Sequence, residues 1–256
     1  MIRKKYKNKF LLCYPILEKG IYGILKKIEK IDDKLIDAYE IRLDSLKYID
    51  DSDNKVKEIL NAINVVKKCY KKKKIIATIR TCKEGGKSNI DKRKYAFYIE
   101  EICKNSLADY VDIENDTLKD VGNTFYKHYK KKIILSKHIF DKKFSKEKCK
   151  TIIEKMIKKE CSILKMAVAV YNEKDLYEYM DLAKSYALRL EKRGTKCIFI
   201  AMGDMGKVSR IFPEYTKTQV VFLNAYKKRG LGQFSLKEYI YYRNIIFTKN
   251  KNNILW

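Results

Sequence analysis

The sequence is poor in the residues that hold disulfide-linked or metal-centred folds together. Its 256 residues include only 2 histidines and 2 prolines, and its 7 cysteines are scattered and form no CxxC pair. An odd number of unpaired cysteines argues against a disulfide framework and against a zinc site. The small number of histidines also argues against a histidine-based metal cage. We therefore expect reduced thiols in a cytosolic setting and no bound metal.

Long apolar runs are missing as well. No stretch approaches the ~20 apolar residues that a membrane-spanning helix needs. The N-terminal segment "MIRKKYKNKFLLCYPIL" is basic and then apolar, as in a signal peptide. Its apolar part is short, is broken by Tyr14 and Pro15, and has no small-residue cleavage site. The sequence therefore predicts a soluble, cytoplasmic protein that has no membrane partner.

Acidic residues are scarce relative to basic ones. The chain has 58 Lys and Arg against 32 Asp and Glu, which gives a net charge of +26. Such a field attracts polyanions, so a basic nucleic-acid-binding protein is the non-enzymatic alternative. However, the basic residues are spread along the whole chain and no known nucleic-acid-binding motif is present. We therefore interpret the charge as a compositional bias and predict no specific nucleic-acid partner.

No linker rich in proline, glycine or serine divides the chain, so we predict one domain over residues 1–256. Short apolar runs alternate with helix-like stretches such as 55–70, 146–160 and 175–194, which have apolar residues at helical spacing. The runs read "KFLLCYP", "LIDAYEIRLD", "KIIATIRT", "ADYVDIE", "KKIILSKH", "SILKMAVAV", "KCIFIAM" and "TQVVFLNA". This order and the length predict a (β/α)8 TIM barrel. A doubly wound open sheet would need a glycine-rich turn after the first strand, and "CYPILEKG" does not match GxGxxG.

In a TIM barrel the chemistry lies at the carboxyl ends of the strands. Polar residues at the predicted strand ends are therefore the candidates for a site. They are Glu40, Arg42, Asp44, Arg80, Glu84, Asp112, Glu114, His138, Lys165, the segment 202–210 and Gln233.

Lys165 is the most informative of these candidates, because it is the one charged residue in the apolar run "SILKMAVAV". Burial disfavours an ammonium, and a neutral amine is a nucleophile that forms an imine with a ketone. A protonated imine makes the neighbouring C–H acidic, and His138 at the end of the preceding strand is suited to move that proton. Glu84 is a candidate to orient His138. Alternatively, Lys165 points outward or pairs with Asp112 or Glu114.

Arginines at the strand ends indicate an anionic substrate. Arg42, Arg80 and Arg210 can each make a forked contact to a carboxylate or phosphate. The glycines of "MGDMGKVSR" offer backbone amides that can also hold a phosphate. A class I Schiff-base aldolase acting on a phosphorylated sugar is therefore the enzymatic alternative.

Taken together, these motifs resemble type I 3-dehydroquinate dehydratase, the Schiff-base dehydratase of the shikimate pathway. The similar segments, in chain order, are "EIRLD" (40–44), "TIRTCKEGG" (78–86), "VDIE" (111–114), "SKHIF" (136–140), "ILKMAV" (163–168), "MGDMGKVSRI" (202–211) and "GLGQ" (230–233). The resemblance runs from about residue 40 to residue 233.

The resemblance implies a homodimeric (β/α)8 barrel that dehydrates the small molecule 3-dehydroquinate to 3-dehydroshikimate without metal or organic cofactor. It implies that Lys165 forms the imine, that His138 is the general acid/base and that Glu84 is its carboxylate partner. It places the remaining matched residues around the substrate: Glu40, Arg42, Arg80, Asp112, Met202, Arg210 and Gln233.

Two segments depart from the family pattern. The family usually has Asp after the histidine, where this chain has Ile139. In the last loop, Arg229 and Leu231 stand where the family tends to have Ser and Pro. Neither departure changes Lys165, His138 or Glu84, so the expected chemistry is unchanged.

Overall fold

The computed structural model describes residues 10–32, 34–47, 49, 55–117, 123–224 and 232–248. Strands and helices alternate along these residues. The strands are β1 (Leu11–Ile16), β2 (Ala38–Arg42), β3 (Lys74–Thr78), β4 (Tyr110–Glu114), β5 (Ile133–Ile139), β6 (Ile163–Ala169), β7 (Lys196–Met202) and β8 (Val220–Phe222). The helices are α2 (Ile21–Ile31), α3 (Lys55–Cys69), α4 (Lys92–Asn105), α5 (Asn123–Tyr129), α6 (Lys146–Ile157), α7 (Glu173–Lys192), α8 (Lys207–Ile211) and α9 (Leu236–Thr248).

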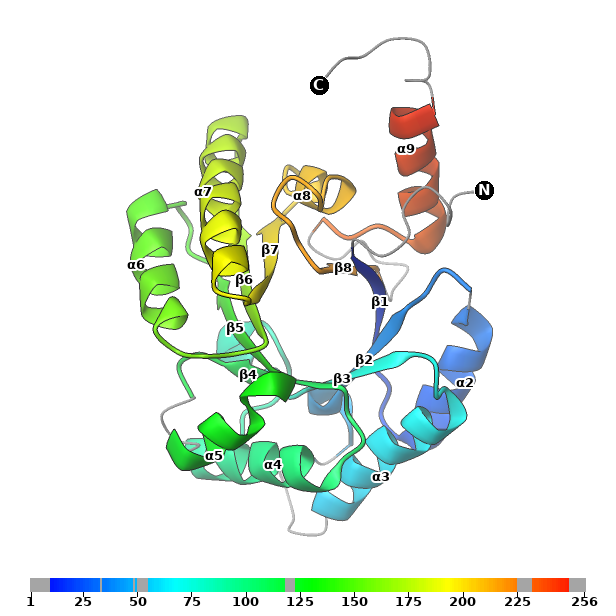
Figure 1. Cartoon of the computed structure of the whole chain (residues 1–256). Coiled ribbons are helices and arrows are strands. Elements are labelled where there is room, and N and C mark those ends of the chain that lie inside the picture. Colours follow the sequence, from blue (N-terminus) through cyan, green and yellow to red (C-terminus); the bar gives the residue numbers. More distant parts are fainter. Residues whose placement is uncertain are drawn as a thin grey trace.

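The eight strands form one parallel sheet in the order β7-β6-β5-β4-β3-β2-β1-β8. The sheet curls until the two edges meet, where Cys197 on β7 bridges Thr218 and its carbonyl accepts from the Gln219 N–H at 2.8 Å. The helices lie outside this ring of strands (Figure 1). The predicted (β/α)8 barrel is therefore confirmed, with every predicted apolar run contributing a strand.

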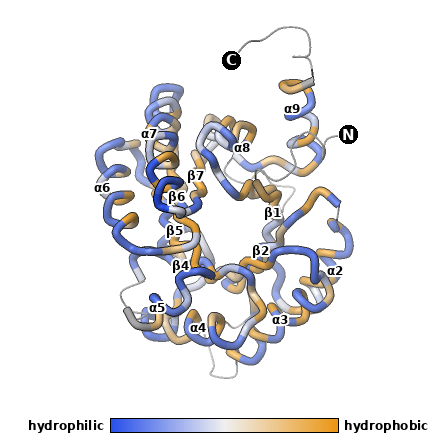
Figure 2. Tube along the Cα trace, in the orientation of Figure 1, coloured by the Kyte–Doolittle hydropathy of each residue, from blue (hydrophilic) through white to orange (hydrophobic). Residues whose placement is uncertain are grey.

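Two apolar cores hold the barrel. The larger core lies between the strands and the helices, whose apolar faces turn inward (Figure 2). The smaller core fills the barrel interior with side chains such as Cys13, Ile76, Ile134 and Ile198. Helix α7 shows how the sequence sets a boundary, because Asn172 at its N-cap accepts from the Asp175 N–H at 2.9 Å. Among the described residues, no helix is long and apolar enough to span a membrane.

Candidate active site

One layer of the barrel interior is ionic. In a TIM barrel, alternate strands contribute the side chains of a layer. Here Glu40 of β2, Asp112 of β4, Lys165 of β6 and Phe222 of β8 converge inside the barrel, and the first three lie within their strands rather than at the ends. Below this layer the interior is apolar, so the change from apolar to charged side chains marks the floor of the site.

Lys165 points into the barrel, and its side chain is only 5% exposed. Its Nζ donates to Asp112 Oδ2 at 2.9 Å and lies 4.0 Å from Glu40 Oε1. The Phe222 ring centroid is 4.4 Å from the same nitrogen, within range of a cation–π contact. The outward-facing alternative is therefore wrong, whereas the pairing with Asp112 that the sequence left open is present.

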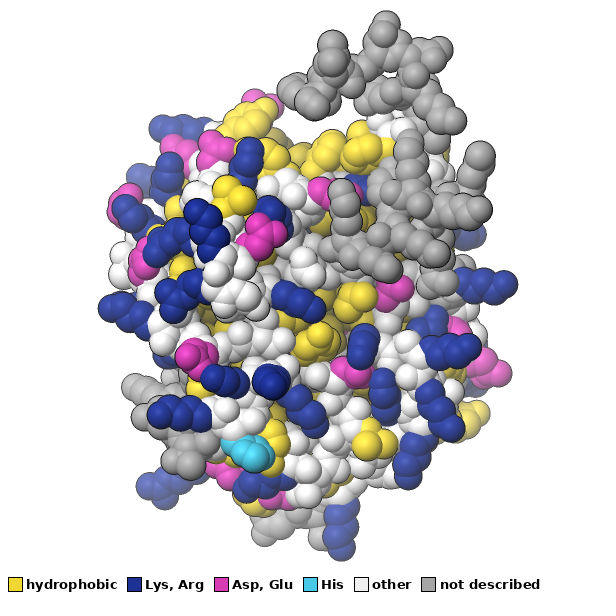
Figure 3. All heavy atoms as spheres, in the orientation of Figure 1, with side chains coloured by type: hydrophobic (Ala, Val, Ile, Leu, Met, Phe, Trp, Pro, Cys, Tyr) yellow, Lys and Arg dark blue, Asp and Glu magenta, His cyan; other side chains and the backbone are white. Residues whose placement is uncertain are grey.

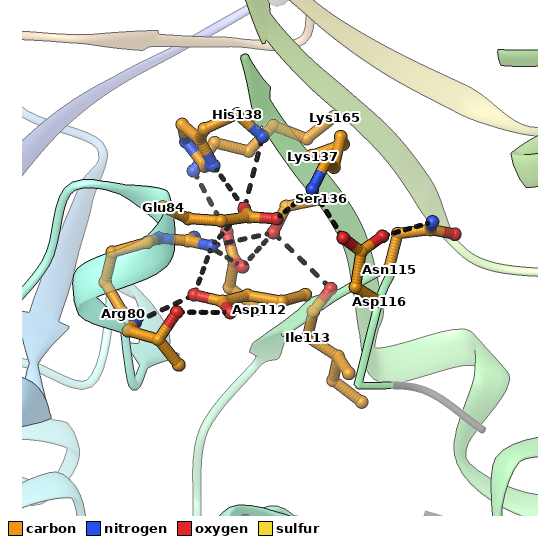
Figure 4. Close-up of polar contacts among 12 residues, drawn as sticks. Arg80, Glu84, Asp112, Ile113, Asn115, Asp116, Ser136, Lys137, His138 and Lys165 are labelled. Atoms are coloured by element: carbon orange, nitrogen blue, oxygen red, sulfur yellow. Dashed lines mark hydrogen bonds and ion pairs between the residues drawn. The ribbon is translucent and has the colours of Figure 1, made fainter. Parts of the chain in front are cut away.

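Arg80 organises the carboxylates of the site. Its guanidinium contacts Asp112 at 2.6 Å, Glu114 at 3.2 Å and Glu84 at 3.3 Å (Figure 4). Burial alone would lower the pKa of Arg80, yet these carboxylates raise it. Burial likewise tends to raise the pKa of Asp112, but the charges of Arg80 and Lys165 hold it well below its usual range. Because an unpaired buried charge is costly, this mutual compensation is what allows so many ions to share one site.

His138 and Glu84 form the second part of the site. Glu84 Oε2 lies 2.9 Å from His138 Nδ1 and also accepts from the His138 backbone N–H at 3.1 Å. Burial raises the pKa of Glu84 to about 7, with repulsion from Glu114 adding to the effect. Burial and the positive charges of Arg80 and Lys165 lower the pKa of His138 well below its ordinary value. The imidazole is therefore neutral near pH 7, and its Nδ1 lies against the Glu84 carboxylate.

The loop that carries Glu84 is tightly pinned. The carboxylate of Asp44 binds Arg42 through two contacts of 2.8 Å and accepts from the backbone N–H groups of Arg80 and Lys87 at 3.3 and 3.1 Å. Gly86 is required by close approach, since a Cβ there would lie 2.0 Å from the Arg80 carbonyl oxygen. These contacts fix Glu84 against the end of β5.

Ile139 does not face the histidine ring. Its side chain is buried in the core between the strands and the helices, because successive residues of a strand point to opposite sides. The polar contacts of His138 come instead from Glu84, which binds both its ring and its backbone N–H. The other departures, Arg229 and Leu231, lie outside the described residues.

Arg210 and its segment are built differently from the rest of the site. Arg210 Nη1 donates to the carbonyl oxygens of Ala201 at 2.8 Å and Gly206 at 3.4 Å. Burial lowers the pKa of Arg210 to about 10. A Cβ on Gly206 would lie 2.2 Å from the Ala201 carbonyl oxygen, so this glycine allows the loop to pack on β7. The geometry favours a packing role for Gly206 over the phosphate cradle that an aldolase would need.

The two remaining sequence candidates border the mouth. Met202 ends β7 and lines a cavity of about 310 Å³ together with Phe140, Ala169 and Asp204. Gln233 is partly buried and follows Gly232, which packs against the Gly203 carbonyl. Met202 is the last residue of β7, and Gln233 lies in the segment between β8 and α9.

The structure adds polar residues that the sequence interpretation missed. Ser136 accepts from Arg80 Nη1 at 3.0 Å and donates to Asp112. Thr78 donates to Glu40 Oε1 at 2.9 Å. Ser136 stands two residues before His138 on β5, and Thr78 stands two residues before Arg80 at the end of β3. Period-two alternation could therefore have identified both, because it places such pairs on one face.

A parallel eight-stranded barrel with an ionisable cluster at the carboxyl ends of its strands defines an enzyme of the (β/α)8-barrel class. The family model described as Type I 3-dehydroquinase matches residues 12–249. The chain therefore belongs to the type I 3-dehydroquinate dehydratase family, whose members are hydro-lyases.

Individual relatives agree with this family. The 3-dehydroquinate dehydratase of Lactococcus lactis subsp. lactis is 30% identical over 224 residues, covering 87% of this chain and 92% of the relative. That of Clostridium novyi is 27% identical, covering 89% and 88%. A crystal structure of the type I enzyme from Clostridium difficile, with covalently modified comenic acid, has a TM-score of 0.79, 25% identity and 93% coverage of both chains.

Proposed function

We propose that this chain removes water from 3-dehydroquinate to give 3-dehydroshikimate through an imine on Lys165. The observation that carries the proposal is the Lys165 amine, which is inside the barrel and within 2.9 Å of a buried carboxylate. The covalently modified ligand in the Clostridium difficile relative is consistent with a nucleophile in a site of this family.

In the proposed reaction, the ammonium of Lys165 gives up a proton before its nitrogen attacks the substrate ketone. The carbonyl oxygen takes up this proton and a second one from the nitrogen and leaves as water, which gives a protonated imine. The iminium withdraws electrons, so the adjacent C–H becomes acidic and His138 removes its proton. The electron pair expels the substrate hydroxyl, which takes a proton from His138 and departs as water. A second water then hydrolyses the imine, releasing the product ketone and the free amine. The imine itself serves as the electron sink, so the steps use no metal or organic cofactor.

We propose that the surrounding side chains bind the substrate. Arg42 and Arg210 contribute positive charge at the mouth, which suits the substrate carboxylate. Glu40 and Gln233 are proposed to form hydrogen bonds with the hydroxyl groups of the substrate. Arg80, Asp112 and Met202 are proposed to border the substrate, with Arg80 and Asp112 also holding Lys165 and Glu84 in place.

The direct test is to incubate the protein with 3-dehydroquinate, add borohydride and measure the intact mass. Reduction of an imine gives a stable adduct, and peptide mapping should locate it at Lys165. Failure to dehydrate 3-dehydroquinate, together with absence of an adduct, would refute the proposed function.

We expect Glu84→Gln to weaken the acid/base step and to alter its pH dependence. The pKa of Glu84 is about 7, so lowering the pH through 7 protonates the carboxylate and removes the acceptor for His138 Nδ1–H. Wild-type kcat should therefore fall on the acid side of neutrality. Glu84→Gln should lower kcat by roughly 10- to 100-fold, which is less than the loss expected on removing the histidine. It should also flatten the acid limb of the pH profile, the part in which kcat falls as the pH is lowered. A pH profile of kcat for both proteins checks this, and an unchanged profile would contradict it.

The high positive charge predicts only a modest effect of salt on the reaction. Among the described residues on the face seen in Figure 3, acidic side chains lie between the basic ones. Screening of the arginines at the mouth should change kcat/KM by less than about threefold between low and physiological salt. A salt titration of activity and of generic DNA binding checks this. DNA binding that persists at physiological salt and competes with substrate would instead support the nucleic-acid alternative.

We further propose that the enzyme is a cytoplasmic homodimer. All seven cysteines are free thiols, which suits a reducing compartment. The dimer is carried over from the family resemblance, and sedimentation or light scattering in solution tests it.

A further inference from the structure

Lys137 occupies an unexpected place beside the His138–Glu84 pair. It stands on β5 between Ser136 and His138, so alternation turns its side chain away from the barrel interior. Even so, Lys137 Nζ reaches Glu84 Oε1 at 3.1 Å and Asp116 Oδ2 at 2.7 Å (Figure 4). Since Glu84 Oε2 faces His138 Nδ1 at 2.9 Å, the two oxygens of one carboxylate are divided between the lysine and the histidine.

The contact with Lys137 compensates the negative charge of Glu84 in an unfavourable environment. It is buried, and Glu114 on β4 repels its negative charge. The neighbouring guanidinium of Arg80 lies 3.3 Å away, but it is shared with Glu114 and Asp112. The charged and titratable groups around Glu84 are therefore Arg80 from the end of β3, Glu114 from β4, and Lys137 and His138 from β5.

Lys137 also lies on a different side of Glu84 from the Lys165 layer. Its side chain lines a cavity of about 520 Å³ that is bounded by segments 81–95 and 114–117 and by Lys159 from the loop after α6. Lys165 does not line that cavity. In the described contacts, Glu84 links Lys137 to the His138 ring, because one of its oxygens binds each of them.

We propose that Lys137 is a positioning residue, which holds Glu84 ionised and turned toward His138 by binding its second oxygen. This inference rests on the proposed function, in which Glu84 supports the general acid/base. It assigns a role to a strand position that none of the predicted site residues occupies.

The test compares three variants under identical conditions. Lys137→Met removes the charge and keeps the bulk, Lys137→Arg keeps the charge, and Lys159→Met is the matched control. Lys159 lines the same cavity, but its Nζ donates to Asn115 at 2.9 Å.

Lys137→Met should lower kcat on the order of 10-fold with KM nearly unchanged, which is less than a lost acid/base would cost. Its acid limb should move to higher pH by about one unit, because Glu84 loses an opposite charge. Lys137→Arg should restore most of the wild-type kcat and should return the acid limb close to its wild-type pH. Lys159→Met should match the wild type in both.

A second measurement needs no turnover. The chain has only 2 histidines, so the His138 ring can be followed by NMR with ¹⁵N-labelled imidazole. Titration of the Glu84 carboxyl group should perturb the Nδ1 signal of His138. The pH at the midpoint of this change should rise in Lys137→Met but not in Lys159→Met. An unchanged midpoint and acid limb in Lys137→Met would overturn the positioning role. If the wild type fails to dehydrate 3-dehydroquinate while the midpoint still shifts, the proposed function fails and the contact-based role of Lys137 stands.

Discussion

Replacing Lys165 with Ala is expected to abolish borohydride trapping and to lower dehydration by at least ~10⁴-fold, the scale on which loss of a covalent nucleophile acts. Without the amine no imine forms, and the C–H next to the ketone is far less acidic. The fold should persist, because Asp112 retains its contacts with Arg80 and Ser136. Intact-mass analysis after borohydride treatment and a rate assay measure both effects.

Lys165→Met is the matched variant for this experiment. It keeps most of the side-chain volume against Phe222 while removing the amine, so it separates loss of chemistry from loss of packing. Both variants should show the wild-type circular dichroism spectrum. An adduct that persists in either variant, or that maps to another lysine, would place the imine elsewhere.

Replacing His138 with Ala is expected to separate imine formation from dehydration. The Lys165 amine remains, so the imine can still form, although proton transfers during its formation slow. Removal of the C–H proton and departure of water both need a positioned acid/base, which typically contributes ~10²–10⁴ in rate. Turnover should fall by at least that factor, and the covalent intermediate should accumulate. Borohydride should therefore trap more adduct from this variant than from the wild type at equal times.

His128→Ala provides the control, because His128 is the second histidine and is exposed on α5, beside the Tyr129 ring. This variant should keep wild-type turnover and trapping. Near-native turnover in His138→Ala would show that the role assigned to His138 is wrong. Glu84 or a substrate group would then have to move the protons.

The architecture could be predicted because it depends on the local spacing of apolar residues along the sequence. Parallel strands buried on both faces read as short apolar runs, and amphipathic helices between them read as period-3.6 stretches. Lys165 was conspicuous for the same reason, since a charge inside such a run has no solvated face on which to lie. The order of the motifs from "EIRLD" to "GLGQ" was sufficient to indicate the family.

The partners of each side chain could not be predicted, because they depend on the register of neighbouring strands and on the length of each side chain. Arg80 meets three carboxylates from separate segments, and Arg210 turns to backbone carbonyls although the two residues looked equivalent as strand-end arginines. Lys137 is turned away from the barrel interior by alternation, yet its long side chain reaches Glu84. The sequence alone therefore determined the barrel, the family and the residues at the strand ends. Only the tertiary structure decided which of those charges compensate one another, because compensation depends on distances of a few ångströms between segments far apart in the chain.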